Sequence, residues 1–193
     1  MKSLKTLPDD YKQIFSVNLQ KDKKMLILIN IAALVIAVVM AVPMHFHISF
    51  FNLFDMSSGI GAYAIRFFVL IVAIIAYIVL HELVHGISMK MCGTEKVKYG
   101  FTGVYAFAGS SDYYDKKSYI FIALAPVVLW GAVLAVINAF VSESWFWVVY
   151  IIQISNIYGA AGDFYVTFKF LKFPKDILIQ DDGVSMKVFS KEI

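Results

Sequence analysis

Residues 63–91 (YAIRFFVLIVAIIAYIVLHELVHGISMKM) form a 29-residue stretch that is apolar except at its ends and at His81, Glu82 and His85. About 20 apolar residues are enough for a helix to cross a bilayer. The stretch is therefore long enough to span a membrane, and it carries three ionisable groups where such groups are costly. It decides both the expected fold class and the search for a functional site.

Three further apolar stretches of comparable length flank this one, at residues 25–44, 119–141 and 145–168. The whole chain of 193 residues is 60% hydrophobic and 16% charged, well away from the composition of ordinary soluble domains. We therefore expect an all-α membrane protein with four transmembrane helices, in one domain over residues 1–193. Residues 1–24 read as a short polar lead-in.

Two segments outside the helices carry turn signals. Residues 95–117 mix β-branched and aromatic residues with three glycines, which predicts a short β-hairpin or re-entrant loop between the second and third spans. Residues 177–189 contain Asp182-Gly183 between two apolar runs, which predicts a hairpin in a small cytoplasmic tail, 169–193.

The positions of the lysines predict how the chain is oriented in the membrane. Residues 1–24 hold six lysines, residues 90–117 hold five and residues 169–193 hold five, whereas residues 45–62 and 142–144 have no lysine or arginine. Lysine and arginine favour cytoplasmic loops. We therefore expect an integral protein of a bacterial plasma membrane with both termini in the cytoplasm. A net charge of +3 and the absence of a basic patch argue against a nucleic-acid partner.

His81-Glu82-Leu83-Val84-His85 is an HExxH motif. On a helix, residues i and i+4 share a face, so both imidazoles can bind one metal ion, and Glu82 can act as general base toward a metal-activated water. The alternative is two core histidines beside a glutamate that reaches the interface. The cost of burying Glu82 without a partner favours the metal site.

A catalytic zinc ion usually has three protein ligands, and Asp163 is the best third candidate. His81 lies 18 residues after Tyr63 and Asp163 lies 18 residues after Trp145, each about 27 Å along a helix from the outer end of its span. Two parallel helices would bring these ligands to one level. The alternative role for Asp163 is an ion pair with a lysine such as Lys169.

Two further residues are candidates near this level. Asn156, seven residues before Asp163 on nearly the same face, could donate a hydrogen bond to a substrate carbonyl, although a lone asparagine in such a helix more often holds helices together. Pro126 frees a backbone carbonyl in the third span, where it would kink the helix or shape a notch.

HELVHG on an apolar helix, Ala125-Pro126 in the next span and the Asn156-x-x-Gly159-x-x-Gly162-Asp163 pattern resemble the bacterial putative zincin peptidase family. They are also similar to the site-two protease class of intramembrane metalloproteases. The resemblance implies that His81, His85 and Asp163 bind Zn²⁺ and that Glu82 is the general base.

The expected function is thus a membrane-embedded zinc metalloprotease that cleaves membrane or juxtamembrane polypeptides in extended form. A strand edge within residues 97–108 could hold such a substrate by β-addition. Two alternatives belong to other classes: a non-catalytic membrane scaffold that retains a zinc site, and an ion transporter. The spans have no ionisable residue in the outer half except Arg66 near its edge, which disfavours transport.

Overall fold

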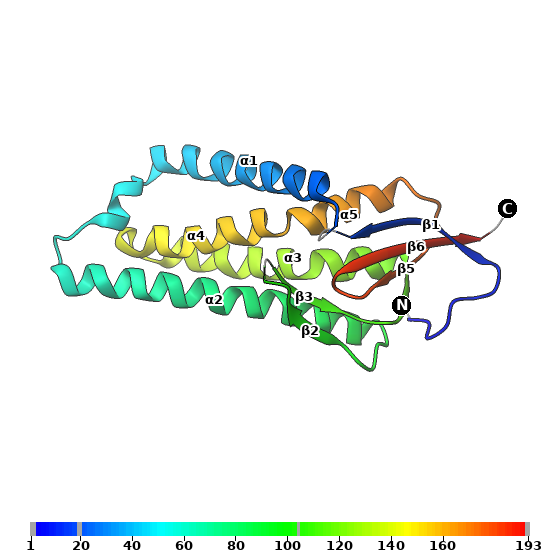
Figure 1. The fold of residues 1–193 in the computed structure, drawn as a ribbon. Coiled ribbons are helices and arrows are strands. Elements are labelled where there is room, and N and C mark those ends of the chain that lie inside the picture. The colour runs from blue at the N-terminus through cyan, green and yellow to red at the C-terminus, as the bar shows by residue number, and fades with distance from the viewer. Residues whose placement is uncertain (1–2, 19–20, 104, 192–193) are drawn as a thin grey trace. The chain divides into compact units, whose positions relative to one another are not determined.

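The computed structural model describes residues 3–18, 21–103 and 105–191. Over these residues the chain is a mixed α and β protein with five α-helices, one 3-10 helix and six strands (Figure 1). The all-α expectation is wrong, because the polar segments outside the apolar helices pair into two sheets. The helices are α1 Lys23–His47, η1 Phe50–Phe54, α2 Ile60–Met91, α3 Lys116–Phe140, α4 Glu143–Gly159 and α5 Ala161–Leu171. The strands are β1 Tyr11–Asn18, β2 Lys98–Phe101, β3 Ala106–Gly109, β4 Tyr113–Asp115, β5 Leu178–Asp181 and β6 Ser185–Lys191.

Three helices, α1, α2 and α3, are long and apolar enough to cross a membrane, which indicates membrane association. The expected fourth span, 145–168, is wrong as a single helix. It is divided at Ala160 into α4 and α5, because Gly159 ends α4 and the Ala160 amide bonds to the Tyr158 carbonyl. With 17 and 11 residues, both helices are shorter than the about 20 residues that usually cross a bilayer.

Strands form where the sequence turns polar. The four-stranded sheet has the order β1-β6-β5-β4, and every neighbouring pair is antiparallel. Its β5–β6 hairpin confirms the turn predicted at Asp182-Gly183, where Gly183 has a φ of 89°. β1 lies within the predicted polar lead-in, where no strand was predicted. The alternation of Phe15 and Val17 with polar residues gives β1 one core-facing side.

β2 and β3 form a separate two-stranded sheet, which confirms a β-hairpin in the segment between α2 and α3. The register pairs Lys98 with Gly109 and Phe101 with Ala106. Residue 104, within the predicted substrate-binding segment 97–108, lies outside the described residues.

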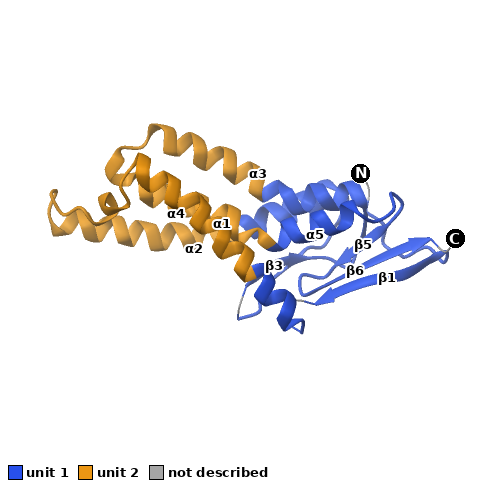
Figure 2. Cartoon of the chain, turned by 90° about the horizontal axis from the view of Figure 1, so that it is seen from above, with its two compact units in different colours: residues 1–29, 81–126, 162–193 blue, residues 30–80, 127–161 orange. Residues whose placement is uncertain are grey.

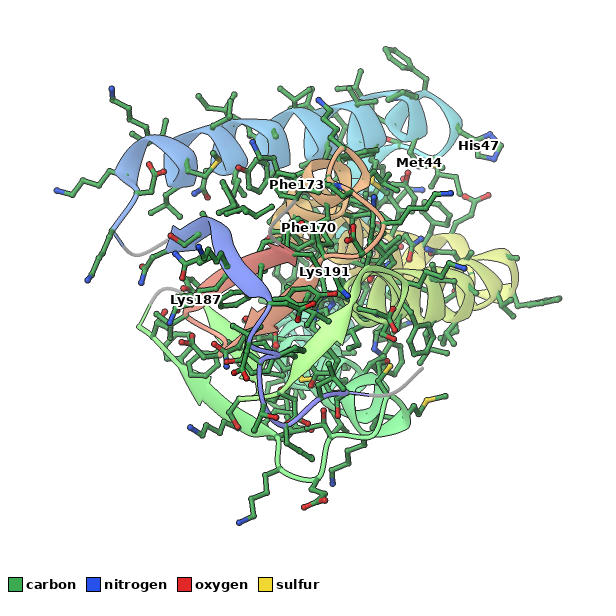
Figure 3. All side chains as sticks on the ribbon, turned by 90° about the vertical axis from the view of Figure 1, so that its right-hand side faces the viewer. Met44, His47, Phe170, Phe173, Lys187 and Lys191 are labelled. Carbon is green, nitrogen blue, oxygen red and sulfur yellow. The ribbon has the colours of Figure 1, made fainter. Side chains whose placement is uncertain are left out.

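The chain divides into two compact units (Figure 2). Unit 1 comprises residues 1–29, 81–126 and 162–193, and unit 2 comprises residues 30–80 and 127–161. Unit 1 holds both sheets, and its core packs α5 and the first turns of α3 against the four-stranded sheet. Phe170, with its ring 6.1 Å from that of Phe173, is completely buried there (Figure 3).

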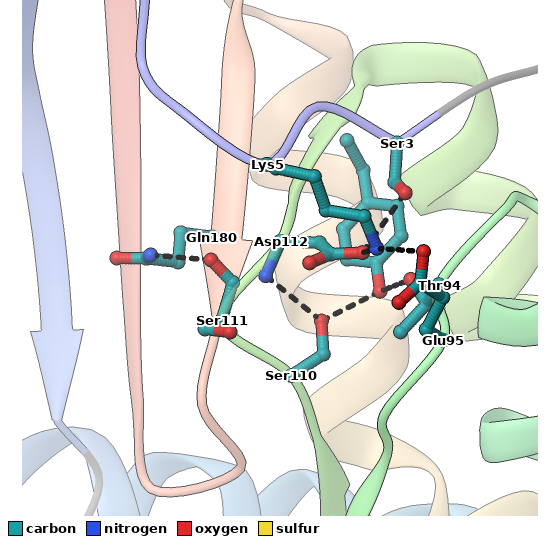
Figure 4. A network of polar contacts seen from close by, with 9 residues as sticks. Ser3, Lys5, Thr94, Glu95, Ser110, Ser111, Asp112 and Gln180 are labelled. Atoms are coloured by element: carbon teal, nitrogen blue, oxygen red, sulfur yellow. Dashed lines mark hydrogen bonds and ion pairs between the residues drawn. The ribbon is translucent and has the colours of Figure 1, made fainter.

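A polar network ties the first residues of the chain to unit 1 (Figure 4). The buried Asp112 carboxylate accepts hydrogen bonds from the Ser3 hydroxyl at 2.9 Å and from the Lys5 ammonium at 3.1 Å. The Tyr114 hydroxyl is 2.5 Å from Thr94 Oγ1 and 2.6 Å from Ser110 Oγ. Because these buried polar groups are paired, the loops around the end of α2 are held in one arrangement.

Unit 2 has its own core of aromatic and aliphatic side chains centred on Trp147. Arg66, which the sequence places near the edge of the second span, is buried in this unit. The guanidinium donates to the backbone carbonyls of Asn52, Asp55 and Ser144, joining η1 to the start of α4. Both terminal nitrogens of this buried cation donate to carbonyls, while its Nε has no partner among the described residues, and we interpret Arg66 as a structural anchor.

Candidate metal centre

Two histidines of α2 provide one side of the candidate centre. His81 and His85 are one turn apart on the helix, and both are buried, with 8% of their surface exposed. Their ring centroids are 4.9 Å apart. The i, i+4 spacing therefore does what the sequence predicted, bringing two imidazoles together on one face.

Asp163, in the first turn of α5, provides the other side. Its Oδ2 lies 3.5 Å from His81 Nε2, and its Oδ1 lies 3.6 Å from His85 Nε2. The break at Ala160 starts a new helix just before this residue, so Asp163 sits at a helix N-terminus rather than within a continuous span. All three residues belong to unit 1.

The three side chains fit a zinc ion. One ligand atom from each lies within 4.8 Å of the other two. Zinc–nitrogen and zinc–oxygen bonds of about 2.0–2.2 Å in tetrahedral geometry place ligand atoms about 3.3–3.6 Å apart, close to the two distances from Asp163. Two neutral imidazoles and one carboxylate are also a donor set that zinc prefers.

The His85 ring is held in the form that a metal requires. His85 Nδ1 lies 2.9 Å from the Ile122 carbonyl oxygen of α3, and a carbonyl can only accept, so Nδ1 carries the proton. The Nε2 lone pair is then directed to the side where Asp163 lies. In an α-helix the Ile122 carbonyl would bond to the amide of residue 126, but Pro126 has no N–H. The proline thus leaves this carbonyl for His85.

Glu82 lies between the two histidines in sequence and is half-buried. The backbone N–H of Ala108 in β3 lies near its carboxylate. One turn further along α2, Gly86 is covered by the Tyr99 ring of β2; a Cβ at position 86 would overlap the Tyr99 hydroxyl oxygen. The β2–β3 hairpin therefore lies directly against the HELVHG segment.

Asn156 belongs to unit 2 and is completely buried. Its Oδ1 accepts a hydrogen bond from Tyr77 at 2.9 Å, and its Nδ2 donates to the Val127 carbonyl at 3.1 Å. Both ends of the amide are engaged within the helices of that unit. These contacts match the helix-packing alternative, and a catalytic role for Asn156 stays a prediction.

The other alternative, an Asp163–Lys169 ion pair, has no support among the described contacts. The Lys169 ammonium lies over the Phe15 ring, 5.1 Å from its centroid. Sequence reasoning did not identify Tyr99, Ala108 or the Ile122 carbonyl. Pro126 indicated that a backbone carbonyl would lack its helical partner. The sequence did not show that this carbonyl meets His85, because that contact depends on packing between helices. The Tyr99–Gly86 contact joins a strand to a helix, and no periodic pattern in the sequence predicts it.

Comparison with known proteins identifies a family to which the chain is similar. The family described as "Putative zincin peptidase" matches residues 74–178, just over half of the chain. An "Uncharacterized 24.7 kDa protein in gap 5'region" from Pyrococcus woesei is 28% identical over 123 residues, or 61% of this chain. The match spans 53% of that relative, so about half of its length is represented here. No solved structure matches the chain.

Proposed function

Since the chain belongs to the putative zincin peptidase family, we propose that it is a membrane-embedded zinc metalloprotease. The observation that carries the proposal is the meeting of His81, His85 and Asp163, with their ligand atoms within 4.8 Å of one another, beside Glu82. The family supports a metallopeptidase, and the three apolar helices support a location in a membrane.

His81, His85 and Asp163 would hold the zinc ion, which when bound would acidify a water molecule and polarise the carbonyl of the scissile peptide bond. Glu82 takes a proton from the attacking water and passes it to the leaving nitrogen, so that a carboxylate and an amine result. The Ile122 carbonyl keeps His85 in the tautomer that presents Nε2. The Glu82 carboxylate lies near the backbone N–H of Ala108 in β3.

The proposed substrate is a membrane or juxtamembrane polypeptide, extended at the cleavage point because a helix keeps its carbonyls in internal bonds. Among the described residues, β3 pairs with β2 on one side only, which leaves its other edge for β-addition. The lysine distribution supports cytoplasmic termini in a plasma membrane.

Metal content tests the centre first. Elemental analysis of the detergent-purified protein is expected to give about one zinc per chain in the wild type and to lose most of it in Asp163→Ala. Asp176→Ala, which removes an exposed carboxylate of the same unit, serves as the matched control and should keep the metal. A folded wild-type protein without zinc would contradict the proposal.

Turnover tests the enzyme against the non-catalytic scaffold. Hydrolysis of fluorescently labelled casein by the zinc-loaded protein should be abolished in Glu82→Gln while zinc is retained. Glu95→Gln, an exposed glutamate beyond the end of α2, is the control and should cleave normally. Cleavage by Glu82→Gln at the wild-type rate would exclude the proposed mechanism, and metal without any turnover would favour the scaffold.

A further inference from the structure

A tyrosine covers the HELVHG helix beside the proposed base. Tyr99 lies in β2, and its ring is so close to Gly86 that a Cβ there would overlap the hydroxyl oxygen and approach Cζ to 2.6 Å. Gly86 is four residues after Glu82, so the two share a face of α2. The Tyr99 hydroxyl is thus placed one helical turn from the general base.

Tyr99 is able to act on a bound molecule at this place. About half of its surface (49%) is exposed, and no hydrogen-bond partner for its hydroxyl is found among the residues that the structure describes. Burial of the phenol, together with the negative charge of Glu82, raises the pKa of Tyr99. The phenol therefore keeps its proton at neutral pH and remains a hydrogen-bond donor.

A hydrolase that adds water to a carbonyl benefits from a donor aimed at the oxygen that becomes negative. Asn156 has both ends of its amide engaged elsewhere. The Tyr99 hydroxyl, by contrast, has no hydrogen-bond partner within residues 3–18, 21–103 and 105–191, and it lies on the Glu82 face of α2.

We infer that Tyr99 is a further catalytic residue of the proposed peptidase: its hydroxyl donates a hydrogen bond to the oxygen of the scissile carbonyl as water adds to the carbon. This inference rests on the proposed function. The hydrogen bond strengthens as negative charge develops on that oxygen, while Glu82 holds the proton taken from water. Gly86 is the residue that lets the phenol reach this position.

The test uses the full-length, detergent-purified protein loaded with cobalt(II), whose visible spectrum reports ligands, and acetohydroxamate as the probe. Acetohydroxamate places an anionic oxygen at a metal and needs no knowledge of the natural substrate. Tyr99→Phe removes only the hydroxyl. Tyr105→Phe makes the same change in the loop between β2 and β3. The pKa of the Tyr105 phenol is raised by burial and by the charges of Asp181 and Asp182, and Glu82 is not among the causes.

Tyr99→Phe is expected to bind metal like the wild type, to bind acetohydroxamate about 10-fold more weakly, and to cleave casein about 100-fold more slowly. Tyr105→Phe should match the wild type in all three. Wild-type acetohydroxamate affinity and turnover in Tyr99→Phe would overturn the inference and leave the proposed function intact. Equal losses in both variants would also overturn it. If the wild type binds no metal, both the proposed function and this inference are wrong.

Discussion

The orientation of the His85 imidazole depends on a proline that is not its hydrogen-bond partner. Pro126 leaves the Ile122 carbonyl without its helical partner, and His85 Nδ1 uses that carbonyl at 2.9 Å. Outer-shell partners of this kind fix the ring and raise ligand basicity, and their loss typically costs 10–100-fold in metal affinity. A proline that would otherwise weaken a helix thereby contributes to the metal centre.

Replacing Pro126 with alanine should therefore weaken zinc binding. The new N–H at position 126 competes with His85 for the Ile122 carbonyl, and because a carbonyl has two lone pairs we expect a loss of up to about 10-fold. Titration against a chromophoric zinc chelator measures the affinity. Pro43→Ala, a proline inside α1, is the matched control and should bind zinc normally. Unchanged affinity in Pro126→Ala would show that the freed carbonyl does not hold the ring.

A second prediction at the residue scale concerns the effect of a side chain at Gly86 on the binding of acetohydroxamate. Alanine stabilises a helix interior by about 0.5–1 kcal/mol relative to glycine, but a Cβ at position 86 must displace the Tyr99 ring. Gly86→Ala is expected to reduce acetohydroxamate affinity as much as Tyr99→Phe does. Gly61→Ala, on the same helix with nothing within 4 Å of the new Cβ, should leave the affinity unchanged. Full affinity in Gly86→Ala would mean that the position of Tyr99 does not matter.

At the scale of elements, the sequence predicts helices by periodicity and length but not their interruptions. The apolar composition of α1, α2 and α3 was sufficient to predict each within a few residues of its ends. Gly159, Ala160 and Ala161 are compatible both with a closely packed continuous helix and with a helix that loosens at this point, so they did not decide between one helix and the division into α4 and α5. The strand pairing of β1 also depends on a partner nearly 170 residues away, which no local pattern specifies.

The sequence also could not identify the hydrogen-bond partners of Asn156, because they lie on two other helices. Asn156→Leu removes two buried hydrogen bonds and should lower the free energy of unfolding by about 1–3 kcal/mol, measured by thermal unfolding in detergent, with zinc retained. Asn138→Leu is the control, because the buried Asn138 Oδ1 has no hydrogen-bond partner in the part of the chain that the structure describes; that change should be neutral or stabilising. Unchanged stability with lost turnover in Asn156→Leu would instead favour the catalytic role.

At the scale of the whole molecule, one sheet restricts how the chain can cross a membrane. β1, β4, β5 and β6 hydrogen-bond to one another, and β1 and β4 are separated in sequence by the apolar helices α1 and α2. Backbone hydrogen bonds between strands require the strands to be on the same side of the bilayer. We therefore predict that the residues of this sheet share one side of the membrane and that the loop between α1 and α2 is on the other side.

Single cysteines introduced in a Cys92→Ser background test this arrangement. Lys12→Cys before α1, Lys96→Cys after α2 and Lys175→Cys after α5 should react with a membrane-impermeant maleimide from the same side of vesicles of known orientation. Ser57→Cys, in the loop between α1 and α2, is exposed and should react only from the opposite side. The lysine distribution predicts that the shared side is cytoplasmic. Labelling of Lys12→Cys and Lys175→Cys from opposite sides would contradict the β1–β6 pairing, because strands separated by a bilayer cannot form a sheet.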